Sequence, residues 1–289
     1  LVFTKCSGKT AVFESGFVWG AIVDNPSQPY VGGSTYRPGL QAGYIDGTGN
    51  HVALDRIFRV RPDIYPDGPE VDLTNEAADE FPLGLDAAGI RAQYEKDWSE
   101  WPANLGAPYF DGNQNGQYDP DPTSGDIPGV PGANQTVWYV ANDQESGLTQ
   151  DLYGTPPMGI EMQATFWAYS QTGALGNMFF RRYLIINKTN VLAGGPKTFT
   201  DMYVSMWSDV DLGNSTDDFV GNDTTLSLSY AYNGVATDQT YSPLPPPSVG
   251  FDFFQGPIVP SPGDSAIFKG RIIYDYKNLP MTAAYYFTR

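Results

Sequence analysis

Apolar and polar residues alternate over several short stretches, most clearly in the second half of the chain. In residues 160–169, IEMQATFWAY, apolar side chains alternate with Glu161, Gln163 and Thr165. This period of two is typical of a β-strand with one face toward a core. The same reading predicts strands at 51–60, 136–140, 177–187, 199–207, 226–232, 266–274 and 282–287, and two short strands about a Ser-Gly turn within 10–23.

One segment has a clear helical period. Asp86 is placed to cap a helix over residues 86–98, in which Ile90, Tyr94 and Trp98 recur every four residues. A shorter helix is predicted over 74–80, with its acids forming a solvated face. The fold class is therefore mainly β, an antiparallel β-sandwich with long Gly/Pro/Asp-rich loops and one or two short helices.

Turn residues suggest where the chain divides. The stretch from 103 to 132 is dense in Gly, Pro, Asp and Asn. We therefore expect an N-terminal strand and loop region over 1–132, with its short helices near 74–98, and a β-sandwich block over 133–289. One continuous domain is the alternative.

Composition and charge narrow the function classes. The chain has 32 Gly, 24 Pro and 14% aromatic residues, which favours strands and turns. Its net charge of −17 repels nucleic acid and anionic membrane surfaces and attracts divalent cations. The single cysteine, Cys6, excludes an intramolecular disulfide, and no apolar run is long enough for a membrane-spanning helix.

The densest group of acids lies between two predicted strands, at residues 207–225, WSDVDLGNSTDDFVGNDTT. This segment has no basic residue, and none occurs anywhere from Thr198 to Phe268. Carboxylates gathered without cations repel one another, and Ca²⁺ relieves that repulsion through six to eight oxygen ligands. The predicted ligands are Asp209, Asp211, Asp217, Asp218 and Asp223. A solvated acidic turn is the alternative.

A second candidate calcium loop is residues 111–121, DGNQNGQYDPD. Its first half matches the D-x-[DN]-x-[DN]-G pattern of calcium loops. The twelfth position is Pro122 instead of Glu, and the flanks are rich in proline, so the segment is not an EF-hand. The predicted ligands are Asp111, Asn113, Asn115, Gln117, Asp119 and Asp121. The alternative is a surface loop rich in Asx turns.

Arrangements for catalysis are few. His51 is the only histidine, and a lone histidine at a strand start is most often structural. A glycosidase would need two carboxylates across a cleft, which Glu161 with Asp209 or Asp211 would supply. Sugar-stacking aromatics are the other route to carbohydrates, and the candidates are Trp138, Tyr139, Trp167, Tyr169 and residues 251–254, FDFF.

Seven segments together carry a family resemblance: SGKTAVFESGFVWGAIVD, RVRPDIYPDGPEVDLTNEAADE, WPANLGAPYFDGNQNGQYDP, DIPGVPGANQTVWYVAND, GIEMQATFWAYSQTGALGNMFFRRYLIINKT, MYVSMWSDVDLGNSTDDFVGNDTT and PPSVGFDFFQGP. In these segments the chain resembles a group of large bacterial secreted proteins that usually end in a type IX secretion sorting domain. This resemblance implies export across the outer membrane, residence outside the cell or on its surface, no assigned enzymatic activity, and a parent chain longer than this one.

These observations favour a secreted, non-enzymatic structural or adhesive module stabilised by Ca²⁺, such as a subunit of a surface layer or filament. Its partners would be further copies of itself, neighbouring surface proteins or glycans, with no nucleic acid and no membrane insertion. A carbohydrate-binding module or glycoside hydrolase is the alternative.

Overall fold

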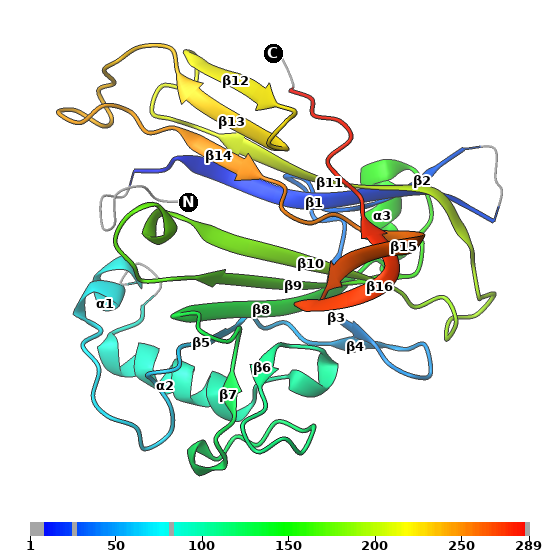
Figure 1. Cartoon of the computed structure of the whole chain (residues 1–289), viewed down its shortest axis with the longest axis horizontal. Coiled ribbons are helices and arrows are strands. Elements are labelled where there is room, and N and C mark those ends of the chain that lie inside the picture. The colour runs from blue at the N-terminus through cyan, green and yellow to red at the C-terminus, as the bar shows by residue number, and fades with distance from the viewer. Residues whose placement is uncertain (1–8, 25–27, 81–83, 287–289) are drawn as a thin grey trace. The chain divides into compact units, whose positions relative to one another are not determined.

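The computed structural model describes residues 9–24, 28–80 and 84–286 (Figure 1). It is 39% strand and 14% helix, with several antiparallel sheets, which confirms the predicted fold class. The strands are β1 (Val12–Val23), β2 (Tyr30–Gly33), β3 (Gln41–Ile45), β4 (His51–Ala53), β5 (Phe58–Val60), β6 (Tyr109–Phe110), β7 (Ile127–Pro128), β8 (Gln135–Asn142), β9 (Ile160–Ala168), β10 (Phe179–Asn187), β11 (Phe199–Val210), β12 (Asp218–Asp223), β13 (Leu228–Asn233), β14 (Val249–Asp252), β15 (Ile258–Phe268) and β16 (Arg271–Asn278). The helices are α1 (Thr74–Glu80), α2 (Ala87–Ser99) and α3 (Ser146–Tyr153), with 3-10 turns η2 (Ala103–Leu105), η3 (Pro122–Ser124) and η4 (Ala174–Asn177). No helix in this described part of the chain is long and apolar enough to cross a membrane.

The chain forms two compact units. The larger covers Gly16–Trp207, and the smaller joins the chain before Gly16 to the chain after Trp207. This division differs from the expected boundary near residue 132. β8 lies beyond that boundary and pairs with β3 and β5 before it, so the two regions share one sheet.

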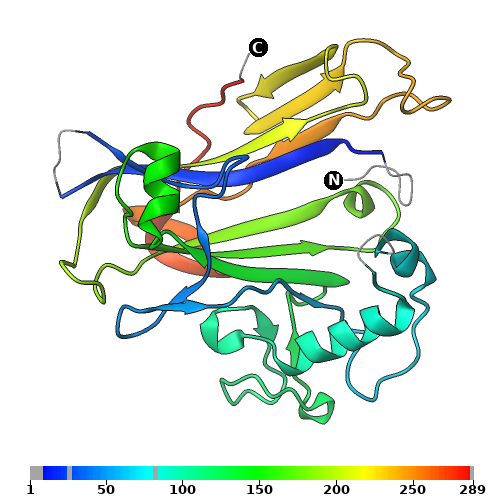
Figure 2. The ribbon, with the colours of Figure 1, turned by 180° about the vertical axis from the view of Figure 1, so that it is seen from behind.

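The larger unit contains two packed sheets. One has the order β10–β9–β8–β3–β4, with β5 also paired to β8, and the other has the order β11–β1–β2. Trp19, Ala21 and Val23 of β1 pack against Ile160 and Met162 of β9, and these five side chains are buried. Figures 1 and 2 show the two layers of this unit from opposite sides.

The second face of the larger sheet is also covered. Phe58 and Trp138 on this sheet form a buried cluster with Trp101, which follows α2. Glu161 and Gln163 on β9 are consequently buried as well. The alternation in β9 predicted that Glu161 and Gln163 face solvent. This prediction is wrong, because a second layer of the fold covers that face of the sheet.

Of the α1 acids predicted to form a solvated face, Asp79 is exposed, but Glu76 and Glu80 are partly buried in ion pairs. Glu80 forms an ion pair with Arg59, and Glu76 forms one with Arg61 at 3.4 Å. Both guanidinium groups lie over the ring of Tyr94. Burial raises the pKa of the Tyr94 hydroxyl, so this phenol stays neutral beside the ion pairs.

Both predicted helices are confirmed, and Asp86 caps α2 by accepting the backbone N–H of Gly89 at 2.8 Å. β1 is one continuous strand through Ser15 and Gly16, where two strands were expected. A Cβ at Gly16 would overlap the Trp207 indole, so glycine here permits close packing across the sheet.

Several other boundaries differ from the prediction. The expected strand at 51–60 is divided into β4 and β5. The expected strand at 266–274 contains a hairpin turn, because Lys269 and Gly270 both adopt positive φ, 50° and 77°. Residues 282–286 form no strand, and residue 287 lies outside the described residues.

The smaller unit holds the sheet β12–β13–β14 and the hairpin β15–β16. Its buried cluster is Ala11, Leu212 and Ala231, with Val210 and Val249 packed against it. β12 was not predicted, because the sequence analysis expected the segment 207–225 that contains it to be a cation loop.

Candidate functional site

The loop of residues 111–126 is closed by a short antiparallel ladder between β6 and β7. α2 anchors the loop, because the Trp98 indole N–H donates to the carbonyl of Pro120 at 3.0 Å. The hydroxyl of Tyr118 in turn donates to the carbonyl of Trp98 at 2.7 Å. These bonds attach the loop to the larger unit and fix its path.

Asp126 organises the interior of this loop. Its carboxylate is 1% exposed and accepts the backbone N–H groups of Gly112 and Asp119, both at 2.9 Å. A third, longer bond of 3.5 Å comes from the N–H of Asn113. A Cβ at Gly112 would overlap the backbone of Gly125, so glycine is required where the two ends of the loop approach.

Four further residues direct polar atoms into the same loop. The carboxylate of Asp111 accepts the N–H groups of Asn115 and Gly116 at 3.2 and 2.8 Å. The side-chain amides of Asn113 and Asn115 both donate to Oδ2 of Asp119 at 2.8 Å. Gly116 supplies the positive φ of 78° at which the loop turns.

Three carboxylates of the loop act together on the hydroxyl of Tyr109. Partial burial raises the pKa of the Tyr109 hydroxyl, and the charges of Asp111, Asp126 and Asp119 raise it further. Among the described residues, no acid of this loop forms an ion pair with Lys, Arg or His. The loop is therefore a concentration of negative charge with no internal cation.

The side chains present fit a hard cation. Carboxylate, amide and carbonyl oxygens are the ligands that Ca²⁺ prefers. The side-chain oxygens of Asn113 and Asn115 accept the backbone N–H groups of Asn115 and Gln117 at 3.0 and 2.7 Å, and each of these oxygens has a second lone pair with which to bind the ion. Within the described ranges, no group of three or more His, Cys, Asp or Glu side chains is arranged to hold a metal ion. Binding here would thus need the asparagine and backbone oxygens as well as Asp111 and Asp119.

One predicted ligand, Asp121, has another role, and one central acid was missed. Asp121 caps η3 by accepting the N–H and hydroxyl of Thr123, and these bonds lower the pKa of its carboxyl. The backbone N–H of Gln117 donates to Oδ1 of Asn115 at 2.7 Å, and the role of the Gln117 carbonyl as a ligand stays a prediction. Asp126 was not predicted, and its only sequence signal is that it is the last acid before the apolar β7.

The segment 207–225 is not a single loop. β11 continues to Val210, and β12 occupies Asp218–Asp223. β12 forms because each of its residues pairs with β13, from Asp218 with Asn233 to Asp223 with Leu228. The expectation of one continuous cation loop is therefore wrong.

Three of the five aspartates predicted in this segment still lie near one another. Asp218 accepts the N–H of Leu212 at 3.0 Å through Oδ2, whereas its Oδ1 is buried without a hydrogen-bond partner. Burial raises the pKa of the Asp218 carboxyl, and the charges of Asp217, Asp211 and Asp238 raise it further. Asp238, which the sequence analysis missed, belongs to this acidic turn.

The other two aspartates are separate from it. Asp223 stands at the opposite end of β12, roughly 17 Å from Asp218 at about 3.3 Å per residue. There it accepts the N–H and hydroxyl of Thr225 at 2.9 and 2.6 Å. Asp209 lies within β11, and the charges that raise the pKa of Asp218 most are those of Asp217, Asp211 and Asp238.

Most of the residues considered for carbohydrate chemistry are buried or partly buried, and Glu161 and His51 have hydrogen-bond partners within the protein. Glu161 is 3% exposed, accepts the N–H of Ile45 at 2.8 Å and pairs with Lys188 at 3.3 Å. His51 lies 3.1 Å from the amide of Asn142, in agreement with a structural role. The candidate aromatics are completely buried at Trp138, partly buried at Tyr139, Trp167, Tyr169, Phe251 and Phe253, and exposed at Phe254.

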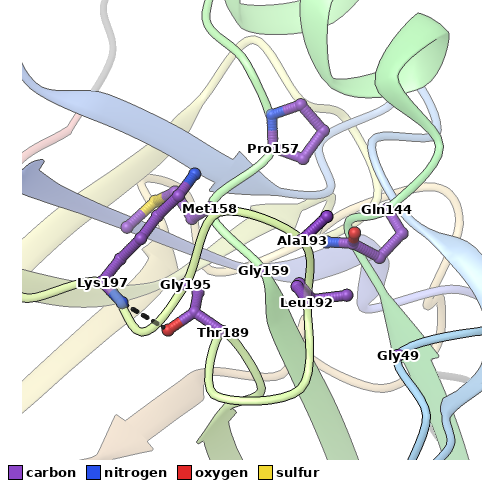
Figure 3. A pocket seen from close by; sticks show the side chains of 10 residues that line it. All are labelled: Gly49, Gln144, Pro157, Met158, Gly159, Thr189, Leu192, Ala193, Gly195 and Lys197. Atoms are coloured by element: carbon purple, nitrogen blue, oxygen red, sulfur yellow. Dashed lines mark hydrogen bonds between the residues drawn. The ribbon is translucent and has the colours of Figure 1, made fainter.

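Two small cavities lie in the larger unit. The first, about 290 Å³, has no acidic or histidine side chain in its lining, and its polar side chains include those of Gln144, Thr189 and Lys197 (Figure 3). The second, about 310 Å³, contains Glu161 and Asp46. Asp46 accepts bonds from Thr48 and Asn50 in its own turn, so both carboxylates of this cavity already have partners.

Comparison of the chain with protein-family models, curated proteins and solved structures gives no match. The candidate site is therefore defined by its own geometry.

Proposed function

We propose that this chain is a secreted structural or adhesive module that Ca²⁺ stabilises through the loop 111–126. The observation that carries the proposal is the gathering of Asp111, Asn113, Asn115 and Asp119 around the buried carboxylate of Asp126. The bound ion would relieve repulsion among acids that have no cationic partner.

The mechanism of stabilisation is thermodynamic linkage. The oxygens of the loop are brought together by β6, β7 and α2, so the folded chain binds the ion and the unfolded chain does not. At a calcium concentration about a hundred times the dissociation constant, the free energy of unfolding rises by about 2.7 kcal/mol. Calcium would then act as a fold-stabilising ion with no part in a reaction.

The extracellular location is supported by two features of the sequence. The net charge of −17 suits a calcium-rich medium outside the cell, and the chain resembles cargo of type IX secretion. A role on the bacterial surface, as a subunit of a layer or filament or as an adhesin, follows from that resemblance.

Thermal unfolding tests the calcium part of the proposal. The protein is heated with Ca²⁺ and with a chelator, beside the variant Asp111→Ala and the control Asp223→Ala. We expect Ca²⁺ to raise the melting temperature of the parent chain and of Asp223→Ala, but not that of Asp111→Ala. An equal rise in all three proteins would contradict a site in this loop.

Light scattering of the same samples tests the assembly part. A subunit of a layer or filament would form larger particles with Ca²⁺ at high protein concentration and smaller ones in chelator. A chain that stays monomeric in both conditions is not a self-assembling subunit, and adhesion to a different partner then stands as its role.

A further inference from the structure

The sheet β12–β13–β14 carries three aromatic side chains on one face. Phe219 of β12 is paired with Tyr232 of β13, and Tyr230 lies two residues before Tyr232 on the same strand. Paired residues and residues two apart share a face of a sheet. We name Phe219, Tyr232 and Tyr230 the aromatic row.

The opposite face of this sheet is the one that contributes to the core. Ala231 lies between the two tyrosines and is 3% exposed, packed with Ala11 and Leu212. The aromatic row therefore points away from the buried cluster of the smaller unit.

The rings of the row lie along the sheet. Gly221 pairs with Tyr230, and a Cβ at Gly221 would overlap the Tyr230 ring. In the same way, a Cβ at Gly234 would overlap the ring of Phe219. A ring that occupies the Cβ position of a facing glycine leans across the neighbouring strand, with one side covered by backbone.

The other side of each ring is open to solvent. Phe219, Tyr232 and Tyr230 are 55%, 43% and 37% exposed. Their centroids follow one another at 5.9 and 6.1 Å, and the angles between ring planes are 24° and 30°. Covering a facing glycine stabilises a sheet but does not require three adjacent exposed rings. An exposed row of this kind marks a binding surface.

Charge decides which ligand fits. The row carries no charged side chain, and no basic residue occurs between Thr198 and Phe268 to hold a phosphate, sulfate or uronate. A second copy of the chain carries the same net charge of −17, so charge gives it no advantage as a ligand of this neutral row. The acids on the same face, Asp223 and Asp252, flank Leu228 beyond one end of the row and leave the rings themselves neutral.

We propose that the aromatic row binds the flat C–H faces of successive pyranose rings in an uncharged polysaccharide. Ring faces are negative and attract weakly positive C–H groups, and an extended row suits a polymer better than a single compact ligand. Asp252, which is exposed, accepts hydroxyl groups at the end of the row. This inference deepens the adhesive part of the proposed function by naming its partner, and it does not depend on calcium.

Affinity electrophoresis tests the inference. The protein migrates through native gels that contain a neutral β-glucan, a galactomannan, an arabinoxylan, a polyuronate as an anionic comparison, or no polymer. The variants are Tyr232→Ala and Tyr230→Ala, and the control is Tyr274→Ala, a tyrosine on β16 that is 76% exposed. We expect at least one neutral polymer to retard the parent chain and Tyr274→Ala, with about tenfold weaker binding for each row variant, equivalent to about 1.4 kcal/mol.

The outcome separates this inference from the calcium proposal, because retardation is measured in chelator as well as in Ca²⁺. No retardation by any neutral polymer would overturn the inference, as would equal retardation of the row variants and the parent chain. Binding to polylysine beads without binding to a neutral polymer would also overturn it, in favour of a cationic protein partner. Melting temperatures confirm that the variants fold. If one does not, tyrosine-ring NMR signals of the parent chain during titration with the neutral oligosaccharide decide instead, because binding must shift those of Tyr230 and Tyr232.

Discussion

The loop 111–126 and the acidic turn formed by Asp211, Asp217, Asp218 and Asp238 are both rich in aspartate, yet they are built differently. In the loop, Asp126 accepts backbone N–H groups of Gly112 and Asp119, and Asp119 in turn accepts two side-chain amides. In the turn, Asp218 has one bound oxygen and one buried oxygen without a partner. One buried acid with hydrogen-bonded oxygens organises the loop, whereas the acids of the turn lie near one another without such a central acceptor.

This difference shows that the density of acids is a poor guide to a cation site. The segment 207–225 has five aspartates, but six of its residues form β12. Asp218 and Asp223 therefore lie at opposite ends of a strand. The loop 111–126 has glycines at 112, 116 and 125 among its polar residues, and Gly116 and Gly125 adopt the positive φ at which the backbone turns.

The largest effect is expected from Asp126→Ala. The substitution removes the acceptor of two 2.9 Å bonds and leaves buried N–H groups without partners. We expect the free energy of unfolding to fall by about 2–4 kcal/mol even in chelator, measured by urea denaturation. A loss below about 0.5 kcal/mol would mean that Asp126 does not organise the loop.

The next effect is that of Asp111→Ala on the calcium response. Asp111 is half-buried, so its loss costs little in chelator, but it removes a carboxylate ligand. We expect the stabilisation by Ca²⁺, about 2.7 kcal/mol at a hundredfold excess over the dissociation constant, to be largely lost. Urea denaturation with and without Ca²⁺ measures this stabilisation. If Asp218→Asn removes the stabilisation by Ca²⁺ and Asp111→Ala does not, the calcium site lies in the acidic turn and not in the loop.

A smaller effect of opposite sign is expected from Asp218→Asn. Its carboxyl has a raised pKa in the folded state, so the folded chain holds the proton more tightly than the unfolded chain. Stability from this group therefore falls as pH rises above the ordinary Asp value of 3.8. We expect the free energy of unfolding of the variant to be higher than that of the parent chain by a few tenths to about 1 kcal/mol at pH 7. Well below pH 3.8 we expect the two free energies to be equal. Thermal unfolding across pH checks this, and a difference that does not vary with pH would refute it.

The smallest effect is expected from Asp223→Ala. Asp223 is bonded within its own turn, to Thr225 and Leu226, and lies far from the other acids. We expect a slight loss of stability, smaller than the change caused by Asp218→Asn, with an unchanged calcium response. A changed response would place Asp223 in a cation site after all.

Sequence patterns predicted the local elements well where the period was strong. α2 follows from Ile90, Tyr94 and Trp98, and β9 from its alternation, although the burial of Glu161 could not be seen because it depends on a second layer far away in the chain. The candidate loop was predicted from its own glycines and asparagines. Asp126 was missed because its role comes from the closure of β6 on β7, which no spacing within the motif encodes.

The aromatic row could not be predicted from the sequence either. Tyr230 and Tyr232 lie in the predicted strand 226–232, and their spacing of two places them on one face of it. Phe219 joins them only because β12 forms and pairs with β13 in this register. The composition indicated many aromatics, but cross-strand pairing selects which three adjoin.

The most direct test of the calcium site is titration with Tb³⁺, which binds the same oxygen ligands as Ca²⁺ and emits when a nearby tyrosine is excited. Tyr109 lies beside Asp111, Asp119 and Asp126, and its ring contacts that of Tyr118 at 5.6 Å between centroids. We predict saturable emission that Ca²⁺ displaces, that is lost in Asp111→Ala, and that persists in Asp218→Asn. Emission that is absent, or that Asp111→Ala leaves unchanged, would contradict a calcium site in the loop 111–126.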